Sequence, residues 1–357
     1  MTKEHSISQA YLSNRNSGLD FLRGAAAFSV AISHFFVFGN GGSIGGEVFA
    51  TIGVEVFFIL SGFVLAPQII QCLSNGVFAL DFKIFIVRRW MRTIPPYVVA
   101  LLAITFISSN SNVNDFFYYF IYAQNLFSVH IENDYFDVAW SLSVEEWFYL
   151  IFPLFLFLLG KILGLNALAG AVIFICFISV GREAFANFLD FDASVRRVVV
   201  FRLDSIALGF VLYLFHPKLS KLSFGVLFAL CFSSLFAVLC SLGTFPLFAA
   251  DIERTFFYLV PVFASSILMI FYKLDSAIKL SRATTFAGHF LGGISYPVYL
   301  FHITVLSILS LNEVQLGTHA WGLVVYLLVI CSFAQIFHVY FELPILRSRP
   351  KFGVKAS

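Results

Sequence analysis

The stretch LDFLRGAAAFSVAISHFF, residues 19–36, carries a cation and an imidazole inside one long apolar segment. Ionisable side chains are expensive at membrane depth, so Arg23 and His34 are candidate functional residues. In an α-helix their separation corresponds to a rise of about 16 Å and about three turns, which leaves both side chains on nearly the same stripe. We predict one helix face with a cation near one membrane surface and an imidazole much deeper.

The composition is that of a membrane protein. Of the 357 residues, 60% are hydrophobic and only 12% are charged, about half the charged fraction of a soluble protein. The net charge of +2 is too small to indicate nucleic-acid binding. The five cysteines form no CxxC pair, so we expect neither a metal site nor a disulfide framework. The fold class predicted from these observations is an all-α, polytopic bundle of membrane-spanning helices.

Ten apolar stretches approach the roughly 20 residues that are needed to cross a bilayer. They lie at about 19–38, 48–66, 93–109, 141–160, 166–181, 200–215, 222–241, 255–272, 291–310 and 320–341. The aromatic stretch at 116–127 is too short to cross and is expected along the outer interface. We expect one membrane domain over residues 1–345 and a short basic cytoplasmic tail over 346–357.

Lysine and arginine residues in the loops predict the orientation. With a cytoplasmic N-terminus, sixteen of these residues fall in cytoplasmic segments and five in outer segments. The stretch from Ser108 to Trp140 has no lysine or arginine but four acidic residues. Both termini are therefore expected in the cytoplasm, with Arg23 toward that side and His34 in the outer half of its helix.

Several other polar residues in the apolar stretches have structural interpretations. Glu55, in GVEVFFILSGFVLA (53–66), is expected to pair with an arginine of the bundle, and Gly62 permits either a close helix or a ligand near the backbone. We predict an ion pair between Arg202 and Asp204. Glu342, near the end of the last span, is expected to pair with a basic group on the cytoplasmic side.

The stretch IVRRWMRTIPPY (86–97) places Arg89 and Arg92 three residues apart, on one helical face. The planar guanidinium can bind two phosphate oxygens, so this pair is a candidate anion site. A basic cluster that merely fixes the orientation of the chain is an equal alternative. Pro95 and Pro96 are expected to break or bend the helix just after the cluster.

Two later stretches supply candidate partners for His34. AWSLSVEEWFYLIFPL (139–154) places Ser143 and Glu146 on one face near the expected depth of His34, where a carboxylate could orient the imidazole. An acidic cap at the start of a helix is the alternative. ISYPVYLFHITVL (294–306) places Tyr299 and His302 on one wall of a cavity, although a lone buried histidine is more typical of packing than of catalysis.

Together these motifs resemble those of the acyltransferase-3 family of bacterial membrane acyltransferases, in order and in spacing. The resemblance implies ten helices that deliver an acyl group from cytoplasmic acyl-CoA to a hydroxyl of an envelope glycan. The family's Arg and His correspond to Arg23 and His34, and its RxxR element to Arg89 and Arg92. Its SxxE element corresponds to the Ser143 and Glu146 pair. Many relatives have an additional C-terminal domain that this chain does not contain, so a stand-alone transferase is expected.

The resemblance and the residues together predict a mechanism. His34 is the expected general base, with Glu146 orienting it or binding the sugar. Ser143, Tyr299 or His302 is expected to bind the acceptor or to stabilise the oxyanion. An acyl-histidine intermediate is an alternative route.

The expected donor is acetyl-CoA or another acyl-CoA, bound through its phosphates by Arg89, Arg92 and Arg23. No permanently bound cofactor, metal ion or nucleic acid is expected. The acceptor would be an envelope saccharide such as O-antigen of lipopolysaccharide or an exopolysaccharide, reached from the bacterial inner membrane. The oligomeric state cannot be read from the sequence.

A second interpretation is a proton-coupled transporter or flippase of a glycan or a lipid-linked saccharide, because intramembrane Arg, His and Glu are also typical of such proteins. Transporters often consist of two matching halves, and the sequence contains no convincing internal repeat. Transfer of label from acetyl-CoA to a glycan would distinguish the enzyme from the transporter.

Overall fold

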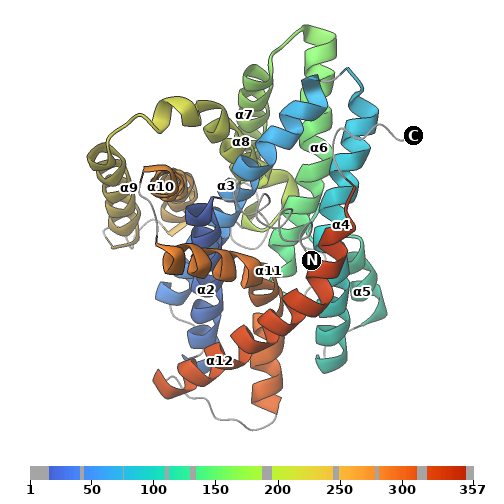
Figure 1. Ribbon diagram of the computed structural model, residues 1–357, viewed down its shortest axis with the longest axis vertical. Helices are drawn as coiled ribbons and strands as arrows, with labels where there is room; N and C mark the ends of the chain where they lie inside the picture. Colours follow the sequence, from blue (N-terminus) through green and yellow to red (C-terminus); the bar gives the residue numbers. More distant parts are fainter. Residues whose placement is uncertain are drawn as a thin grey trace.

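The computed structural model describes residues 16–40, 44–74, 76–108, 112–128, 134–186, 195–243, 249–277, 281–311 and 320–350, and within them every regular element is helical. Figure 1 shows their arrangement. The elements are α2 (Ser17–Asn40), α3 (Ile44–Ser74), α4 (Phe78–Ile107), α5 (Val113–Phe120), α6 (Ala139–Leu163), α7 (Ala167–Ala186), η2 (Val199–Phe201), α8 (Leu203–Leu219), α9 (Phe224–Gly243), α10 (Ala249–Ala277), α11 (Arg282–Leu311), α12 (Ala320–Phe337), η3 (His338–Glu342) and α13 (Leu343–Arg347).

The described part of the chain contains nine helical segments that are long and apolar enough to cross a membrane. This confirms the predicted all-helical, multi-pass class, but not the predicted count of ten. The stretch expected to span at 200–215 forms α8, which has 17 residues. A helix of that length measures about 26 Å, less than the roughly 30 Å of a hydrocarbon core.

Helix α4 begins well before the predicted span at 93–109 and includes the whole basic stretch. Arg89 and Arg92 therefore lie inside a helix, and the helix continues through Pro95 and Pro96 instead of ending there. Membrane helices tolerate proline where neighbouring helices supply hydrogen bonds to nearby carbonyls. Here the Tyr296 hydroxyl of α11 donates to the Thr93 carbonyl at 3.0 Å.

Helix α2 packs tightly against α11 because small residues lie at their crossing. A Cβ atom at Gly24 would lie 2.6 Å from Leu291 Cβ, and one at Gly292 would lie 2.6 Å from Asp20 Cβ. Close backbone approach of this kind is typical of helix pairs in membranes. It brings residues near the start and the end of the chain side by side, which determines the composition of the site below.

Helices α3 and α8 cross in the same way, and a buried ion pair joins them beside the crossing. A Cβ atom at Gly62 would lie 1.8 Å from the Ile206 carbonyl oxygen. The Glu55 carboxylate binds the Arg202 guanidinium at 2.5 Å, and both side chains are fully buried. The prediction that Glu55 pairs with an arginine is confirmed, and Gly62 faces a helix and not a ligand.

The predicted ion pair between Arg202 and Asp204 is wrong. Arg202 points to α3, whereas Asp204 binds Arg182 of α7 at 2.8 Å. The two residues are two positions apart at the start of α8, so their side chains point to different neighbours. Glu342 has the basic partner that was predicted, since its carboxylate lies 2.6 Å from His338 Nδ1, one turn earlier.

Candidate active site

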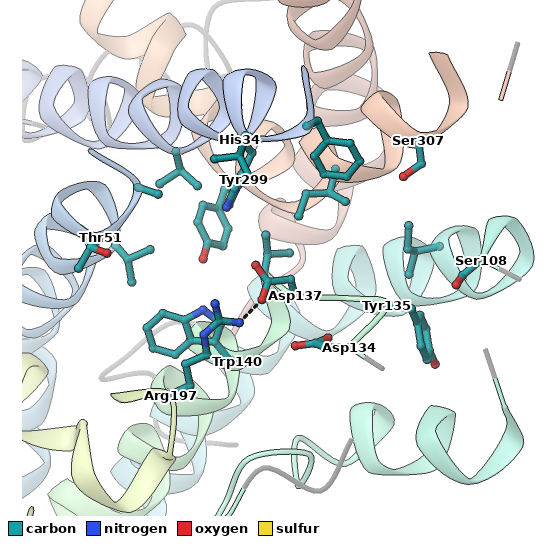
Figure 2. A pocket seen from close by; sticks show the side chains of 18 of the residues that line it. His34, Thr51, Ser108, Asp134, Tyr135, Asp137, Trp140, Arg197, Tyr299 and Ser307 are labelled. Carbon is teal, nitrogen blue, oxygen red and sulfur yellow. Dashed lines mark hydrogen bonds and ion pairs between the residues drawn. The ribbon is translucent and has the colours of Figure 1, made fainter. Parts of the chain in front are cut away.

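A cavity of about 570 Å³ opens between the ends of several helices. Its walls come from the second half of α2, the first half of α3, the ends of α4 and α11, and the segment that leads into α6. Figure 2 shows His34 and Tyr299 on one side of this space, with Trp140 and Arg197 opposite them. Its volume and its mixture of apolar walls with a few polar groups are typical of a small-ligand site.

A second, fully buried histidine holds the imidazole of His34. His34 Nδ1 lies 2.7 Å from His302 Nε2, and the two rings are nearly parallel, with centroids 5.0 Å apart. His302 belongs to α11 and has no exposed surface. The tight packing of α11 on α2 thus joins two residues whose interaction the sequence did not reveal.

The hydrogen bonds assign the protons on both rings. His302 Nδ1 lies 2.6 Å from the Tyr299 carbonyl, which can only accept, so this nitrogen carries the proton. In the neutral ring His302 Nε2 is then an acceptor, and His34 Nδ1 must donate to it. The Nε2 atom of His34 therefore keeps its lone pair. A neutral His34 in this tautomer is suited to accept a proton at the cavity wall.

Tyr299 lines the same cavity, next to the two histidines. Its hydroxyl lies 2.5 Å from the Ser141 hydroxyl, and its ring packs edge-on against Phe57 at 5.3 Å between centroids. The phenol is therefore held by contacts from α3 and α6. Tyr299 lies where a hydroxyl donor could stabilise negative charge that develops close to His34.

The opposite wall carries charges of both signs. Arg197 forms an ion pair with Asp137; both residues line the cavity, and about a third of each side chain is exposed. Asp134 Oδ1 accepts hydrogen bonds from the Tyr119 hydroxyl and from the Phe136 N–H, the latter at 3.1 Å. Desolvation of the carboxyl group by the protein around it, followed by repulsion from Asp137, raises the pKa of Asp134 to about 6. This wall can therefore change its charge near neutral pH.

The predicted contact between Glu146 and His34 is not found among the described residues. Ser143 and Glu146 share a face of α6, as expected, but that face is turned away from the cavity. The Gln124 amide donates to the Ser143 hydroxyl at 2.6 Å, and Glu146 lies against Thr93 of α4. The packing of α6 against α4 decides this rotation, and residue spacing alone does not.

Glu146 is nevertheless placed where a ligand could reach it. Its side chain is buried, and its Oε2 atom has no hydrogen-bond partner among the described residues. The neighbouring Glu145, in contrast, accepts hydrogen bonds from Ser61 at 2.6 Å and from Tyr149 at 2.8 Å. A buried carboxylate oxygen without a partner is costly, so Glu146 is the acidic residue of this pair that is available for binding.

The arginines gather around the first half of α4. The charges of Arg88, Arg92 and Arg349 act on Arg89, whose guanidinium lies 5.9 Å from the centroid of the Phe85 ring. Arg88 also donates to the Pro350 carbonyl. The first residues of the predicted basic tail thus fold back onto α4, while residues 351–357 lie outside the described part of the chain.

The structure places Arg23 in a separate cluster at the start of α2. Its guanidinium lies 3.3 Å from Asp20, which also lies 3.0 Å from His289 Nδ1 of α11. The Arg23 side chain is 20% exposed. The predicted position of Arg23 at the opposite end of the helix from His34 agrees with α2, which runs unbroken from Ser17 to Asn40.

The comparison with known protein families identifies this architecture. Residues 16–340 match the family model described as "Acyltransferase domain". The chain belongs to this acyltransferase-3 family. The match covers nearly all of the chain, and it confirms both the predicted family and the prediction of an acyltransferase.

Two proteins similar to this chain have names that state an activity. A Bacillus subtilis protein named "Putative peptidoglycan O-acetyltransferase YrhL" is 26% identical, over 92% of this chain and 54% of that protein. A Listeria monocytogenes protein named peptidoglycan O-acetyltransferase OatA is 25% identical, over 92% of this chain and 56% of that protein. The chain thus spans somewhat more than half the length of these curated relatives. No solved structure matches it.

Sequence reasoning missed most of the wall of the acyltransferase cavity that faces His34. Asp134 and Asp137 were visible only as part of an acidic outer segment, and Arg197 only as one of the outer cations. The segments that carry them are far apart in the chain. The Asn125 amide joins them by donating to the carbonyls of Arg197 and Trp140.

Proposed function

We propose that this protein is an O-acyltransferase that moves an acyl group, in the simplest case acetyl, from acyl-CoA to a hydroxyl of an envelope saccharide. The observation that carries the proposal is the His34 imidazole, whose Nε2 lone pair is set up at the wall of the cavity by the buried His302. Family membership supports the reaction class. Relatives named as peptidoglycan O-acetyltransferases support a glycan hydroxyl as acceptor and favour this interpretation over transport.

The arrangement of helix ends supports opposite entrances for the two substrates. The cavity lies at the C-terminal ends of α2, α4 and α11 and at the start of α6. Basic residues gather toward the other ends, such as Arg89 in the first half of α4 and Lys161 in the last turn of α6. If the basic side is cytoplasmic, the cavity faces outward, as for a multi-pass protein of the bacterial inner membrane.

The cluster on α4 is the proposed entrance for the donor. Arg88, Arg89 and Arg92 lie within one turn of helix, and Arg349 adds a fourth guanidinium. Like charges are held together at a cost in free energy that a polyanion such as the CoA phosphates would offset. We place the acyl-pantetheine arm between this cluster and the cavity, where the unpartnered oxygen of Glu146 offers a polar contact.

The reaction at the cavity follows from the protons assigned above. His34 Nε2 takes the proton of the acceptor hydroxyl while the hydroxyl oxygen attacks the thioester carbonyl carbon. In this step the Ser141 hydroxyl turns from the Val138 carbonyl and donates to the Tyr299 oxygen. The Tyr299 proton is then free to hydrogen-bond to the carbonyl oxygen as it becomes negative. When the carbon–sulfur bond breaks, the ester remains on the acceptor and the CoA thiolate receives the proton from His34.

The test of the proposal is transfer of labelled acetyl from acetyl-CoA to a glycan extract by the purified full chain in lipid nanodiscs. We expect His34→Gln to lower the turnover by about 10²-fold or more. The matched control is His216→Gln, because His216 lies in the last turn of α8, where it contacts Tyr213 and not the cavity. Full activity of His34→Gln would overturn the assignment of the base.

The donor site is tested separately by titration with acetyl-CoA. Arg89→Gln is expected to weaken binding by about tenfold, the effect of losing one hydrogen-bonded charge. Lys161→Gln, which removes an exposed cation from the same side of the bundle, is expected to leave binding unchanged. Equal titration curves for the two variants would mean that the arginine cluster only fixes the orientation of the chain.

Label retained on the protein when no acceptor is present would indicate an acyl-histidine route.

A further inference from the structure

We propose that the cavity wall formed by Asp134, Asp137, Arg197 and Trp140 is a subsite for an uncharged, hydroxyl-rich sugar ring, and that it holds the acceptor against His34. This inference rests on the proposed function for the identity of the acceptor, but the binding of a sugar can be measured without any transfer. The four residues belong to the cavity wall opposite His34 (Figure 2).

The charges of this wall indicate the kind of ligand. Among the described residues that line the cavity, two carboxylates, Asp134 and Asp137, are balanced by two guanidinium groups, Arg196 and Arg197. A balanced set does not favour a phosphate-bearing donor, which would require an excess of positive charge. Carboxylates accept hydrogen bonds from hydroxyl groups and guanidinium groups donate to them, so this wall suits a ligand with many hydroxyls.

Asp134 is anchored in a way that leaves one oxygen for a ligand. Both of the hydrogen bonds from Tyr119 and Phe136 reach Oδ1. The side chain itself is exposed to the cavity, into which the carboxyl group points in Figure 2. Because Oδ1 is held from behind, binding a sugar hydroxyl at Oδ2 would require little further ordering of the side chain.

Trp140 adds an apolar platform at the same wall. Its ring packs edge-on against Phe58, with centroids 6.0 Å apart and an interplanar angle of 85°. The indole is only partly buried and lines the cavity. An aromatic face beside fixed polar groups matches a pyranose ring, which has apolar C–H faces and a rim of hydroxyls.

The subsite is preorganised by one buried side chain. The Asn125 amide donates to the Trp140 carbonyl at 3.1 Å and to the Arg197 carbonyl at 2.5 Å, and only 2% of Asn125 is exposed. The main-chain carbonyl of Asn125 also accepts from the Val199 N–H at 2.9 Å. These bonds hold the segment that carries Arg197 against the start of α6, so the ion pair and the indole keep a constant separation.

The experiment measures binding of a neutral probe, the trimer of N-acetylglucosamine, to the full chain in nanodiscs without acetyl-CoA. Tryptophan fluorescence and calorimetry report the dissociation constant. We expect binding with quenching of Trp140, and a loss of affinity of about tenfold or more in Asp134→Asn and in Trp140→Leu. The matched controls are Asp115→Asn, on the exposed first turn of α5, and Trp321→Leu, whose side chain is 75% exposed on α12.

Each outcome decides the proposal independently of the reaction. Acetyl-CoA titration should be unchanged in both cavity variants, which shows that they remain folded. Equal affinity of the trimer for the cavity variants and the controls would overturn the subsite, as would a wild-type chain that binds no trimer. Trimer binding that depends on Asp134 and Trp140, in a chain that transfers no acetyl, would support the subsite and refute the proposed function.

Discussion

The side chains of His34 and His302 form one hydrogen-bonded unit across the crossing of α2 and α11, with 2.7 Å between Nδ1 of the first and Nε2 of the second. Because the Tyr299 carbonyl orients His302 from the other side, each ring is held in one tautomer. Contacts of α11 therefore fix the orientation of the His34 imidazole, whose Nε2 atom lies at the cavity wall. In this arrangement His302 is a positioning residue for His34.

Replacing His302 should separate positioning from packing. In His302→Leu no acceptor remains for His34 Nδ1, so we expect kcat to fall by about 10²-fold with little change in KM. In His302→Gln the side-chain carbonyl can still accept that proton, and part of the activity should return. Steady-state kinetics of both variants provides the measurement. If the Leu and Gln variants lose activity equally, His302 has only a packing role.

Asp134 should make saccharide binding depend on pH. Its pKa of about 6 is raised above the usual value for aspartate, so the protonated form predominates below pH 6. A protonated carboxyl group accepts hydrogen bonds from two hydroxyls less well than a carboxylate does. We expect the dissociation constant of the sugar trimer to rise as the pH falls from 7 to 5. The groups that face Asp134 are Tyr119, Asp137 and Arg197.

Protonation of Asp134 stabilises the folded state, although it is expected to weaken sugar binding. A raised pKa in the folded state means that its contribution to stability is full below about pH 4 and is lost as the pH rises through about 6. Weaker sugar binding at pH 5 thus cannot be attributed to unfolding caused by this group. In Asp134→Asn the side chain has no ionisable proton, so calorimetric titrations of this variant at pH 7 and pH 5 test the assignment. A pH-dependence that persists there would contradict the assignment.

The Glu55–Arg202 pair should be essential for stability but replaceable as a unit. Arg202→Met leaves the fully buried Glu55 carboxylate without the cation that it binds, at a cost of about 3–5 kcal/mol in the free energy of unfolding. The double variant Glu55→Leu and Arg202→Met removes both charges and should recover most of that loss. Thermal unfolding in detergent measures both. A double variant no more stable than Arg202→Met would show that this pair contributes more than charge compensation.

The crossing of α3 and α8 should not tolerate a methyl group. A Cβ atom at Gly62 or at Gly209 would lie 1.8 Å or 2.1 Å from a carbonyl oxygen of the opposite helix. Either Gly→Ala variant should therefore lose folded protein, as measured by size-exclusion chromatography. Gly181→Ala is the control, because beyond its own turns of helix no atom of the described residues lies within 4 Å of its Cβ position. That substitution should be neutral or stabilising by up to about 1 kcal/mol.

Part of this protein could be predicted from residue types alone. Hydrophobic length predicts membrane helices because the bilayer imposes one dimension on every span. The position of Glu55 within an apolar stretch predicted that its carboxylate pairs with a cation, since an unpaired charge at that depth is too costly. The sequence could not identify Arg202 as that cation, because whether Arg202 binds Glu55 or Asp204 depends on how α8 is rotated against α3.

The same division holds for the candidate site. The sequence alone predicted the membrane class and the family, which are confirmed, and it singled out His34 as a candidate base, because each depends on composition or on spacing within one segment. Only the tertiary structure decided that His302 and not Glu146 holds His34, and that Asp137, Arg197 and Trp140 form the facing wall. Those contacts join α2 to α11 and α6 to the segment before α8. Their geometry follows from close helix packing at glycines and from one buried asparagine, which no local pattern specifies.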